Sequence, residues 1–169
     1  MGGQRRLCPF LVEYVDLRWQ LAGPDNYPRR RLDRVTHIVV HHSAGRINQD
    51  HSSLALARLH VGFGWPGIGY HFVVHWDGGI EYVGDMGTSR AHAGQLNEVS
   101  VGICIPGNFE EAWPTAAAIA GVNRCIEIVR LFCPGSVVVG HRDIADLTGY
   151  GPTACPGSTW PLWRPEIAA

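Results

Sequence analysis

Residues 35–45 read VTHIVVHHSAG, and this stretch decides the fold. β-Branched residues dominate residues 35–41, which is typical of a strand buried within a sheet. The small residues at 43–45 then end the strand. His41 therefore stands at the carboxyl end of a buried strand, where a side chain can project into a functional site.

The sequence on the C-terminal side of this strand alternates between helical and extended patterns. A helix follows to about residue 61, with Asn48 or Asp50 as its N-cap. A hairpin signal comes next, with a turn at Asp77-Gly78-Gly79. The expected elements are, in order, strand 35–41, a helix to 61, strands 70–75, 80–83 and 99–105, a helix over 114–132 and a short buried strand over 137–139.

The order β-α-β-β-β-α-β predicts the α/β class, with a central mixed β-sheet flanked by helices. Residues 1–34 carry turn signals and weak periodicity, so we expect an irregular or partly helical lead-in packed on the domain formed by residues 35–169. A chain of 169 residues is long enough for one structural domain with a sizeable core. We expect the functional site in a surface cleft at the edge of the sheet.

Composition excludes several classes of protein. The formal net charge is −1 and all 14 basic residues are arginine, so no overall field favours nucleic acid. No apolar run reaches about 18 residues, so we expect no membrane insertion. The first residues lack the apolar run of a secretory signal, which predicts a cytoplasmic protein. Most of the five cysteines are then expected to be reduced, buried thiols.

Three residues far apart in sequence combine into a metal-binding set. His41 ends one predicted strand, His141 follows another in VVVGHRD, and Cys155 lies in the proline-flanked segment PTACPG. Two imidazoles and one thiolate leave a tetrahedral zinc ion one open position, which is the ligand count of a catalytic site. Such an ion acidifies bound water. Sequence separation alone leaves open whether the three meet, because single histidines and cysteines are also common packing residues.

Four segments in fixed order carry a resemblance to a known family. They are VTHIVVHHSAG, GWPGIGYHFVVHWDG, AHAGQLNEVSVGICIPGNF, and GHRDI followed by PTACPG. The chain resembles the zinc-dependent N-acetylmuramoyl-L-alanine amidases, a family that includes phage enzymes and the peptidoglycan recognition proteins. The likeness covers roughly residues 35–160 and implies that Zn²⁺ is the cofactor. It places the zinc ligands on His41, His141 and Cys155.

The same resemblance implies roles for further residues. Tyr70, in GYHF, would donate a hydrogen bond to the oxyanion of the transition state. Thr153, two residues before the cysteine ligand, would act as a neutral hydroxyl where some relatives carry lysine. Trp65, His92 and Asn97 would line the substrate groove, although each also suits a purely structural role. Relative to shorter family members, residues 144–151 form an insertion.

The resemblance implies a peptidoglycan hydrolase that cleaves the amide between N-acetylmuramic acid and L-alanine. We expect a monomeric endolysin that stays in the cytoplasm until it is released to the bacterial cell wall. Three alternatives remain open at this point. They are a cytoplasmic amidase that recycles soluble muropeptides, a non-catalytic peptidoglycan-binding module, and a thiol amidase with Cys155 as nucleophile and His141 as base.

Overall fold

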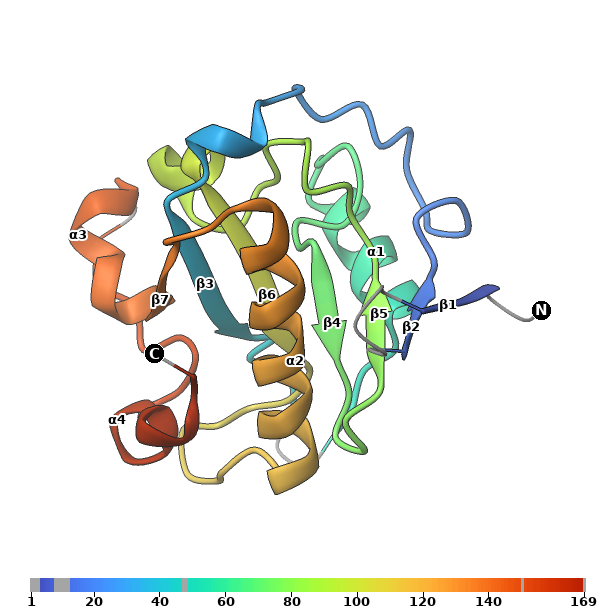
Figure 1. Cartoon of the computed structure of the whole chain (residues 1–169). Coiled ribbons are helices and arrows are strands. Elements are labelled where there is room, and N and C mark those ends of the chain that lie inside the picture. The colour runs from blue at the N-terminus through green and yellow to red at the C-terminus, as the bar shows by residue number, and fades with distance from the viewer. Residues whose placement is uncertain (1–3, 8–12, 47–48, 150, 169) are drawn as a thin grey trace.

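The strand predicted around His41 lies inside a mixed β-sheet (Figure 1). The computed structural model describes residues 4–7, 13–46, 49–149 and 151–168. The strands are β1 (Gln4–Leu7), β2 (Glu13–Asp16), β3 (His37–His42), β4 (Phe72–Val74), β5 (Ile80–Tyr82), β6 (Ser100–Ile105) and β7 (Val137–Gly140). The α-helices are α1 (Ser53–Gly62), α2 (Ala116–Phe132), α3 (Ala145–Thr148) and α4 (Trp160–Trp163). Short 3₁₀ helices cover Leu32–Arg34, Gly94–Val99, His141–Ile144 and Arg164–Glu166.

The order of the elements from β3 to β7 confirms the predicted alternation of strands and helices. The sheet order is β1-β2-β5-β4-β6-β3-β7. β3 pairs in parallel with β6 and with β7, and β4 pairs in parallel with β6. β4 and β5 form the predicted antiparallel hairpin. The α/β class is therefore confirmed, and the carboxyl ends of β3 and β7 lie side by side at one edge of the sheet.

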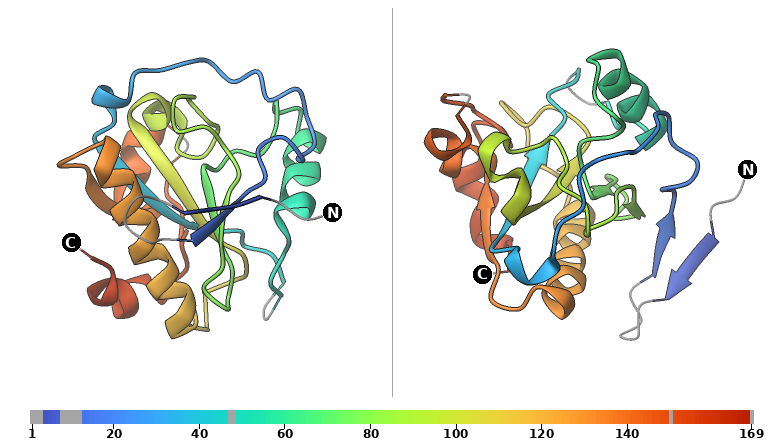
Figure 2. Two further views of the ribbon diagram at one scale, coloured as in Figure 1. Left: turned by 45° about the vertical axis from the view of Figure 1, so that its right-hand side comes forward. Right: turned by 90° about the horizontal axis from the view of Figure 1, so that it is seen from above.

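Helices cover both faces of the sheet, as Figure 2 shows for α1 and α2. Ile38 and Val40 of β3 belong to the large apolar cluster that α2 covers. Leu56 of α1 belongs to a separate apolar cluster. Because successive strand residues point to opposite faces, His41 lies on the face away from α2. The pleat of β3 thus decides on which face of the sheet the candidate site forms.

Helix α1 begins later than the sequence predicts. Its N-cap is Ser52, whose side chain accepts a hydrogen bond from the backbone N–H of Ala55 at 3.3 Å. Asp50, predicted as a possible cap, is instead bonded to the ring of His75. The other predicted cap, Asn48, lies outside the described residues. A competing tertiary partner therefore displaced the local capping preference of Asp50.

The strand before His141 is less buried than predicted. β7 stands at the edge of the sheet and pairs with β3 alone. Val137 is 56% exposed, whereas Val139 is only 9% exposed. A β-branched run predicts a strand but does not tell a central strand from an edge strand, because that depends on which neighbours pair with it.

The lead-in contains strands that the sequence did not predict. The expected irregular or partly helical conformation is wrong for β1 and β2, which pair antiparallel with each other, while β2 continues the sheet in parallel with β5. Each strand has only four residues, too few for a clear period-2 pattern. Tyr27 ties the lead-in to the rest of the chain, because its hydroxyl donates to the carbonyl of Gly67 at 2.9 Å.

Three cysteines have the packing role that the sequence predicts. Cys104, Cys125 and Cys133 are buried free thiols, and no disulfide joins any described cysteines. Cys8 lies outside the described residues. Among the described segments, no helix has both the length and the apolar character needed to cross a membrane.

A charged cluster fastens the segment that precedes α1 to the β4–β5 hairpin. The Nδ1 atom of His75 lies 2.8 Å from Asp50 Oδ1, and its Nε2 atom lies 3.0 Å from Glu81 Oε2. Burial opposes a charge on this ring, but the hydrogen bonds to Glu81 and Asp50 outweigh burial and raise the pKa of His75 to about 9. Both ring nitrogens therefore donate to carboxylates near neutral pH.

This raised pKa predicts a stability that depends on pH. The contribution of His75 is fully present below its unfolded pKa of about 6.5 and is lost as pH rises through about 9. We expect the free energy of unfolding of the wild type, relative to that of His75→Gln, to fall by about 2–3 kcal/mol over this range. Denaturant unfolding at several pH values measures the difference. His37→Gln is the control, and equal pH slopes in the wild type and His75→Gln would contradict the prediction.

Candidate metal centre

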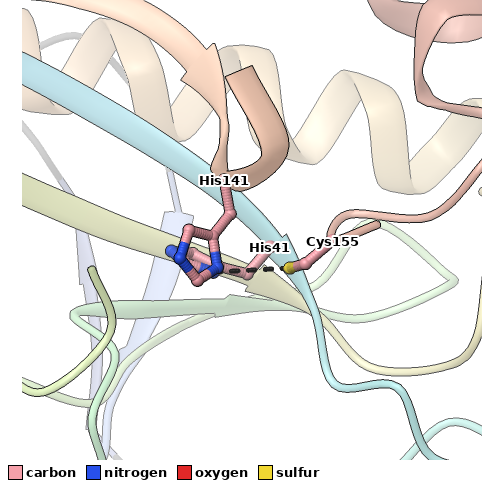
Figure 3. Close-up of side chains that lie close together, drawn as sticks. All are labelled: His41, His141 and Cys155. Carbon is pink, nitrogen blue, oxygen red and sulfur yellow. Dashed lines mark hydrogen bonds between the residues drawn. The ribbon is translucent and has the colours of Figure 1, made fainter. Parts of the chain in front are cut away.

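The three predicted ligands converge at the carboxyl edge of the sheet, as Figure 3 shows. His41 lies near the end of β3, His141 comes directly after β7, and Cys155 lies in the loop before α4. One ligand atom from each residue lies within 4.8 Å of the others. His41 is only 2% exposed, and the other two residues are half-buried. Residues up to 114 positions apart in the sequence thus share one small volume.

The distances and donor atoms fit a zinc ion. The Nδ1 atom of His41 lies 3.5 Å from Cys155 Sγ, and the rings of His41 and His141 have centroids 4.7 Å apart. Tetrahedral zinc with ordinary bond lengths separates its ligand atoms by about 3.3–3.6 Å. The Nε2 atom of His141 is buried, and within the described part of the chain no group hydrogen-bonds to it. Two imidazoles and one sulfur therefore form a set that zinc can bind with small adjustments.

A turn after β7 delivers His141, and a buried tryptophan supports that turn. The Oδ2 atom of Asp143 accepts from the backbone N–H of Gly140 at 2.8 Å and from Trp160 Nε1 at 2.9 Å. A Cβ atom on Gly140 would lie 2.6 Å from Trp160 Nε1, so only glycine fits there. Trp160 and Trp163 are 1% and 0% exposed, so the C-terminal segment packs back on the domain.

The loop that carries Cys155 is fastened on both sides. The backbone N–H of Arg142 donates to the carbonyl of Cys155 at 2.6 Å, which links this loop directly to the His141 turn. The backbone N–H of Cys155 donates to Thr153 Oγ1 at 3.2 Å. Thr153 thus holds the loop as an acceptor, and its hydroxyl proton remains available for donation.

Burial controls the protonation of the ligand set. It lowers the pKa of His41 well below 6.5, with a further contribution from the neighbouring His92 and His141, and it also lowers the pKa of His141. Both imidazoles are therefore neutral, which is the form that binds metals. Burial raises the pKa of the Cys155 thiol to about 12, so a bound cation would have to displace its proton.

Tyr70 lies beside the ligands. Its ring centroid is 5.3 Å from that of His41, and its side chain is half-buried. Burial and the nearby thiols of Cys104 and Cys155 raise the pKa of Tyr70 well above 10. The phenol therefore stays protonated at neutral pH and can donate a hydrogen bond.

Residues that the sequence analysis missed hold the loop that leads to Tyr70. The Nδ1 atom of His60, a buried residue of α1, accepts from the backbone N–H of Gly69 at 2.9 Å. Arg90 is fully buried and donates from Nη1 to the carbonyl of Ile68 at 2.7 Å. No local pattern marks either residue, because each acts on a segment that is distant in sequence.

The three expected substrate contacts lie in different surroundings. Trp65 is half-buried and packs on His60, with ring centroids 4.7 Å apart. The Oδ1 atom of Asn97 accepts from the backbone N–H groups of His92 and Ala93 at 3.0 and 2.7 Å, so it stabilises this turn. His92 is only 8% exposed, and its Nδ1 atom lies 3.1 Å from His41 Nε2. The structure thus brings His92 to the metal ligands rather than to an open surface.

The described part of the insertion, residues 144–149 and 151, packs on the turn that follows His92. It forms the one-turn helix α3, which contacts the 3₁₀ helix at Gly94–Val99. Ile144 is 5% exposed and joins Val39 and Ala93 in an apolar cluster. A Cβ atom on Gly149 would lie 2.7 Å from the side chain of Gln95. The insertion therefore supports the neighbourhood of the site from outside.

Two known proteins are similar to this chain in sequence over most of its length. The endolysin of Enterobacteria phage K11 is 30% identical over 138 residues, covering 79% of this chain and 87% of the phage protein. A peptidoglycan-recognition protein of Drosophila melanogaster is 31% identical over 144 residues, covering 76% of each chain.

A solved structure, the N-acetylmuramoyl-L-alanine amidase LysC from Clostridium intestinale, superimposes with a TM-score of 0.74. The match covers 90% of this chain and 94% of the other at 23% identity, which shows a shared fold. The family model described as N-acetylmuramoyl-L-alanine amidase matches residues 31–158, a range that contains the convergent histidines and cysteine. The chain therefore belongs to the N-acetylmuramoyl-L-alanine amidase family.

Proposed function

We propose that this protein is a zinc-dependent amidase that cleaves the bond between N-acetylmuramic acid and L-alanine in peptidoglycan. The observation that carries the proposal is the convergence of His41, His141 and Cys155, whose ligand atoms lie within 4.8 Å of one another. Three protein ligands leave zinc a fourth position for water or substrate, as in catalytic sites. Membership of the amidase family supports the reaction class.

The proposed chemistry divides between the metal and the chain. Zinc bound there would polarise the amide carbonyl and acidify a water molecule. Tyr70, protonated beside His41, would donate a hydrogen bond to the oxygen that gains negative charge. Thr153 would keep Cys155 in place, because its hydroxyl oxygen accepts from the backbone N–H of Cys155. The hydroxyl of Thr153 would also offer a neutral hydrogen-bond donor.

For the biological setting, we propose an endolysin. Similarity to the endolysin of phage K11 supports a protein that is made in the cytoplasm and released to the cell wall during lysis. The intact wall is then the substrate, and a monomer suffices because one chain supplies all three proposed ligands.

Two other functions use the same fold. A recycling amidase would share the chemistry but prefer soluble anhydro-muropeptides. A peptidoglycan-binding module would need only a groove for its ligand. Similarity to a peptidoglycan-recognition protein supports this alternative, and the experiment below tests it. The complete ligand set, with Cys155 3.5 Å from His41, favours catalysis.

Mass spectrometry of the products from purified sacculi tests the proposal, with and without a zinc chelator. We expect free stem peptides that begin with L-alanine, lost on chelation and restored by added zinc. The same assay on soluble anhydro-muropeptides separates an endolysin from a recycling enzyme.

Each other outcome rejects a specific part of the proposal. Activity that survives chelation would favour Cys155 as a nucleophile over zinc. Cleavage of soluble fragments alone would favour recycling. Binding to sacculi with no product from either substrate would leave a binding module.

A further inference from the structure

A second histidine, His92, contacts His41 at Nε2, whereas Cys155 faces the other ring nitrogen, Nδ1. The Nδ1 atom of His92 lies 3.1 Å from His41 Nε2, and the two rings meet edge to face with centroids 5.2 Å apart. The contact is buried, because His41 is 2% exposed and His92 is 8% exposed. One of the two facing nitrogens must carry a hydrogen and the other must accept it.

Ser100 decides where the hydrogen of His92 resides. The other ring nitrogen, His92 Nε2, faces the carbonyl oxygen and the hydroxyl oxygen of Ser100, both at 3.4 Å. The carbonyl can only accept. The hydroxyl donates its hydrogen to the carbonyl of Leu96 at 2.7 Å, so it too can only accept from His92. The hydrogen of the neutral His92 ring therefore belongs on Nε2, which leaves Nδ1 as an acceptor.

The position of the His92 ring is also restricted. A Cβ atom on Gly102 would lie 2.7 Å from His92 Cγ and 2.8 Å from its Nδ1, so the ring packs directly on the backbone of β6. The backbone N–H of His92 is held by Asn97 Oδ1 at 3.0 Å. Close packing on a glycine and an anchored backbone keep the ring from exchanging its two nitrogens.

These roles determine the tautomer of His41. Because His92 Nδ1 accepts, His41 Nε2 must be the protonated nitrogen. The lone pair of His41 then lies on Nδ1, the atom that is 3.5 Å from Cys155 Sγ. The chain of hydrogen bonds from Leu96 through Ser100 and His92 thus ends in a nitrogen prepared to bind a metal.

We propose that His92 is a positioning residue for the metal ligand His41, an inference that rests on the proposed zinc site. Partners of this kind orient metal-bound histidines in many proteins, and their loss weakens metal binding by about 10- to 100-fold. His92 differs from the usual carboxylate or carbonyl partner, since a neutral imidazole accepts the hydrogen bond and adds no charge. The family resemblance implies a substrate contact for His92 instead, and the experiment below distinguishes the two roles.

A matched pair of substitutions at residue 92 tests the proposal. In His92→Asn, the side-chain oxygen can take the place of the ring Nδ1 and still accept from His41. In His92→Leu, a methyl group of similar size takes that place and cannot accept. The dissociation constant for zinc is measured by competition with a chromophoric chelator, and the melting temperature of each metal-free variant reports folding separately.

We expect His92→Leu to weaken zinc binding by about 10- to 100-fold, and we expect His92→Asn to recover most of the loss. Equal zinc affinity in the wild type and His92→Leu would overturn the proposal, as would equal losses in both variants. An increase in KM of His92→Leu at saturating zinc, with unchanged zinc affinity, would assign His92 to substrate binding instead.

His37→Leu is the control, because His37 begins the same strand at its opposite end and its side chain bonds only to Thr36 among the described contacts. It should leave the zinc affinity unchanged. If the wild type binds no zinc, the proposed function fails. If the wild type binds zinc and His92→Leu binds it equally well, only the role of His92 fails.

Discussion

Replacing Cys155 by alanine is expected to abolish zinc binding and amidase activity while the fold remains. The substitution removes one of the three convergent side chains, the one that offers a sulfur atom. Loss of the metal removes several kcal/mol of transition-state stabilisation, so activity should fall by at least about 10³-fold. Bound zinc is measured by elemental analysis after dialysis, and released stem peptides are measured by mass spectrometry.

The matched control is Cys133→Ala. Cys133 is also a free thiol, but it is 2% exposed and packs in the apolar cluster beneath α2. This variant should lose some stability and keep zinc and activity. Full activity in Cys155→Ala would remove Cys155 from the metal site, whereas bound zinc without activity would separate metal binding from catalysis.

Replacing Tyr70 by phenylalanine is expected to lower kcat by about 10²- to 10³-fold. The ring keeps its packing against His41 and His60, with centroids 5.3 Å from each, and only the hydroxyl is lost. The substitution removes the donor that we propose acts mainly on charge developing in the transition state. Zinc affinity and binding to sacculi should therefore change little, while steady-state hydrolysis of a soluble muropeptide measures the fall in kcat.

Tyr14→Phe provides the comparison for this experiment. Tyr14 lies on β2 and packs edge to face on Tyr82, with ring centroids 6.0 Å apart. Its hydroxyl is not part of the candidate site, so kcat should stay unchanged. A kcat for Tyr70→Phe within about threefold of the wild type would mean that the phenol does not stabilise the oxyanion.

The candidate site was predictable in part, because its ligands stand next to strong local patterns. His41 ends a β-branched run and His141 follows another, so both were expected at strand ends. The sequence motifs named these residues and Cys155 as one set, and the structure places the three together. Sequence patterns did not reveal what holds the set, since the partner of His41 is His92, 51 residues away.

The errors in the predicted fold also come from contacts between residues that are distant in sequence. Asp50 was a reasonable helix cap by local chemistry, but the ring of His75, 25 residues away, bonds to it instead. Val137 was expected to be buried, but β7 has a neighbour on one side only. β1 and β2 were missed because four-residue strands depend on pairing for their stability.

By itself, the sequence determined the order of strands and helices, the hairpin turn at 77–79 and the three residues that converge in the candidate metal centre. Hydrophobic periodicity and turn chemistry act over a few residues, so they can be read along the chain. Only the tertiary structure decided that His92 faces His41 and that Trp160 supports the His141 turn. Those roles depend on which atoms lie within about 3 Å once the sheet has formed, and a hydrogen bond has no periodic signal in sequence.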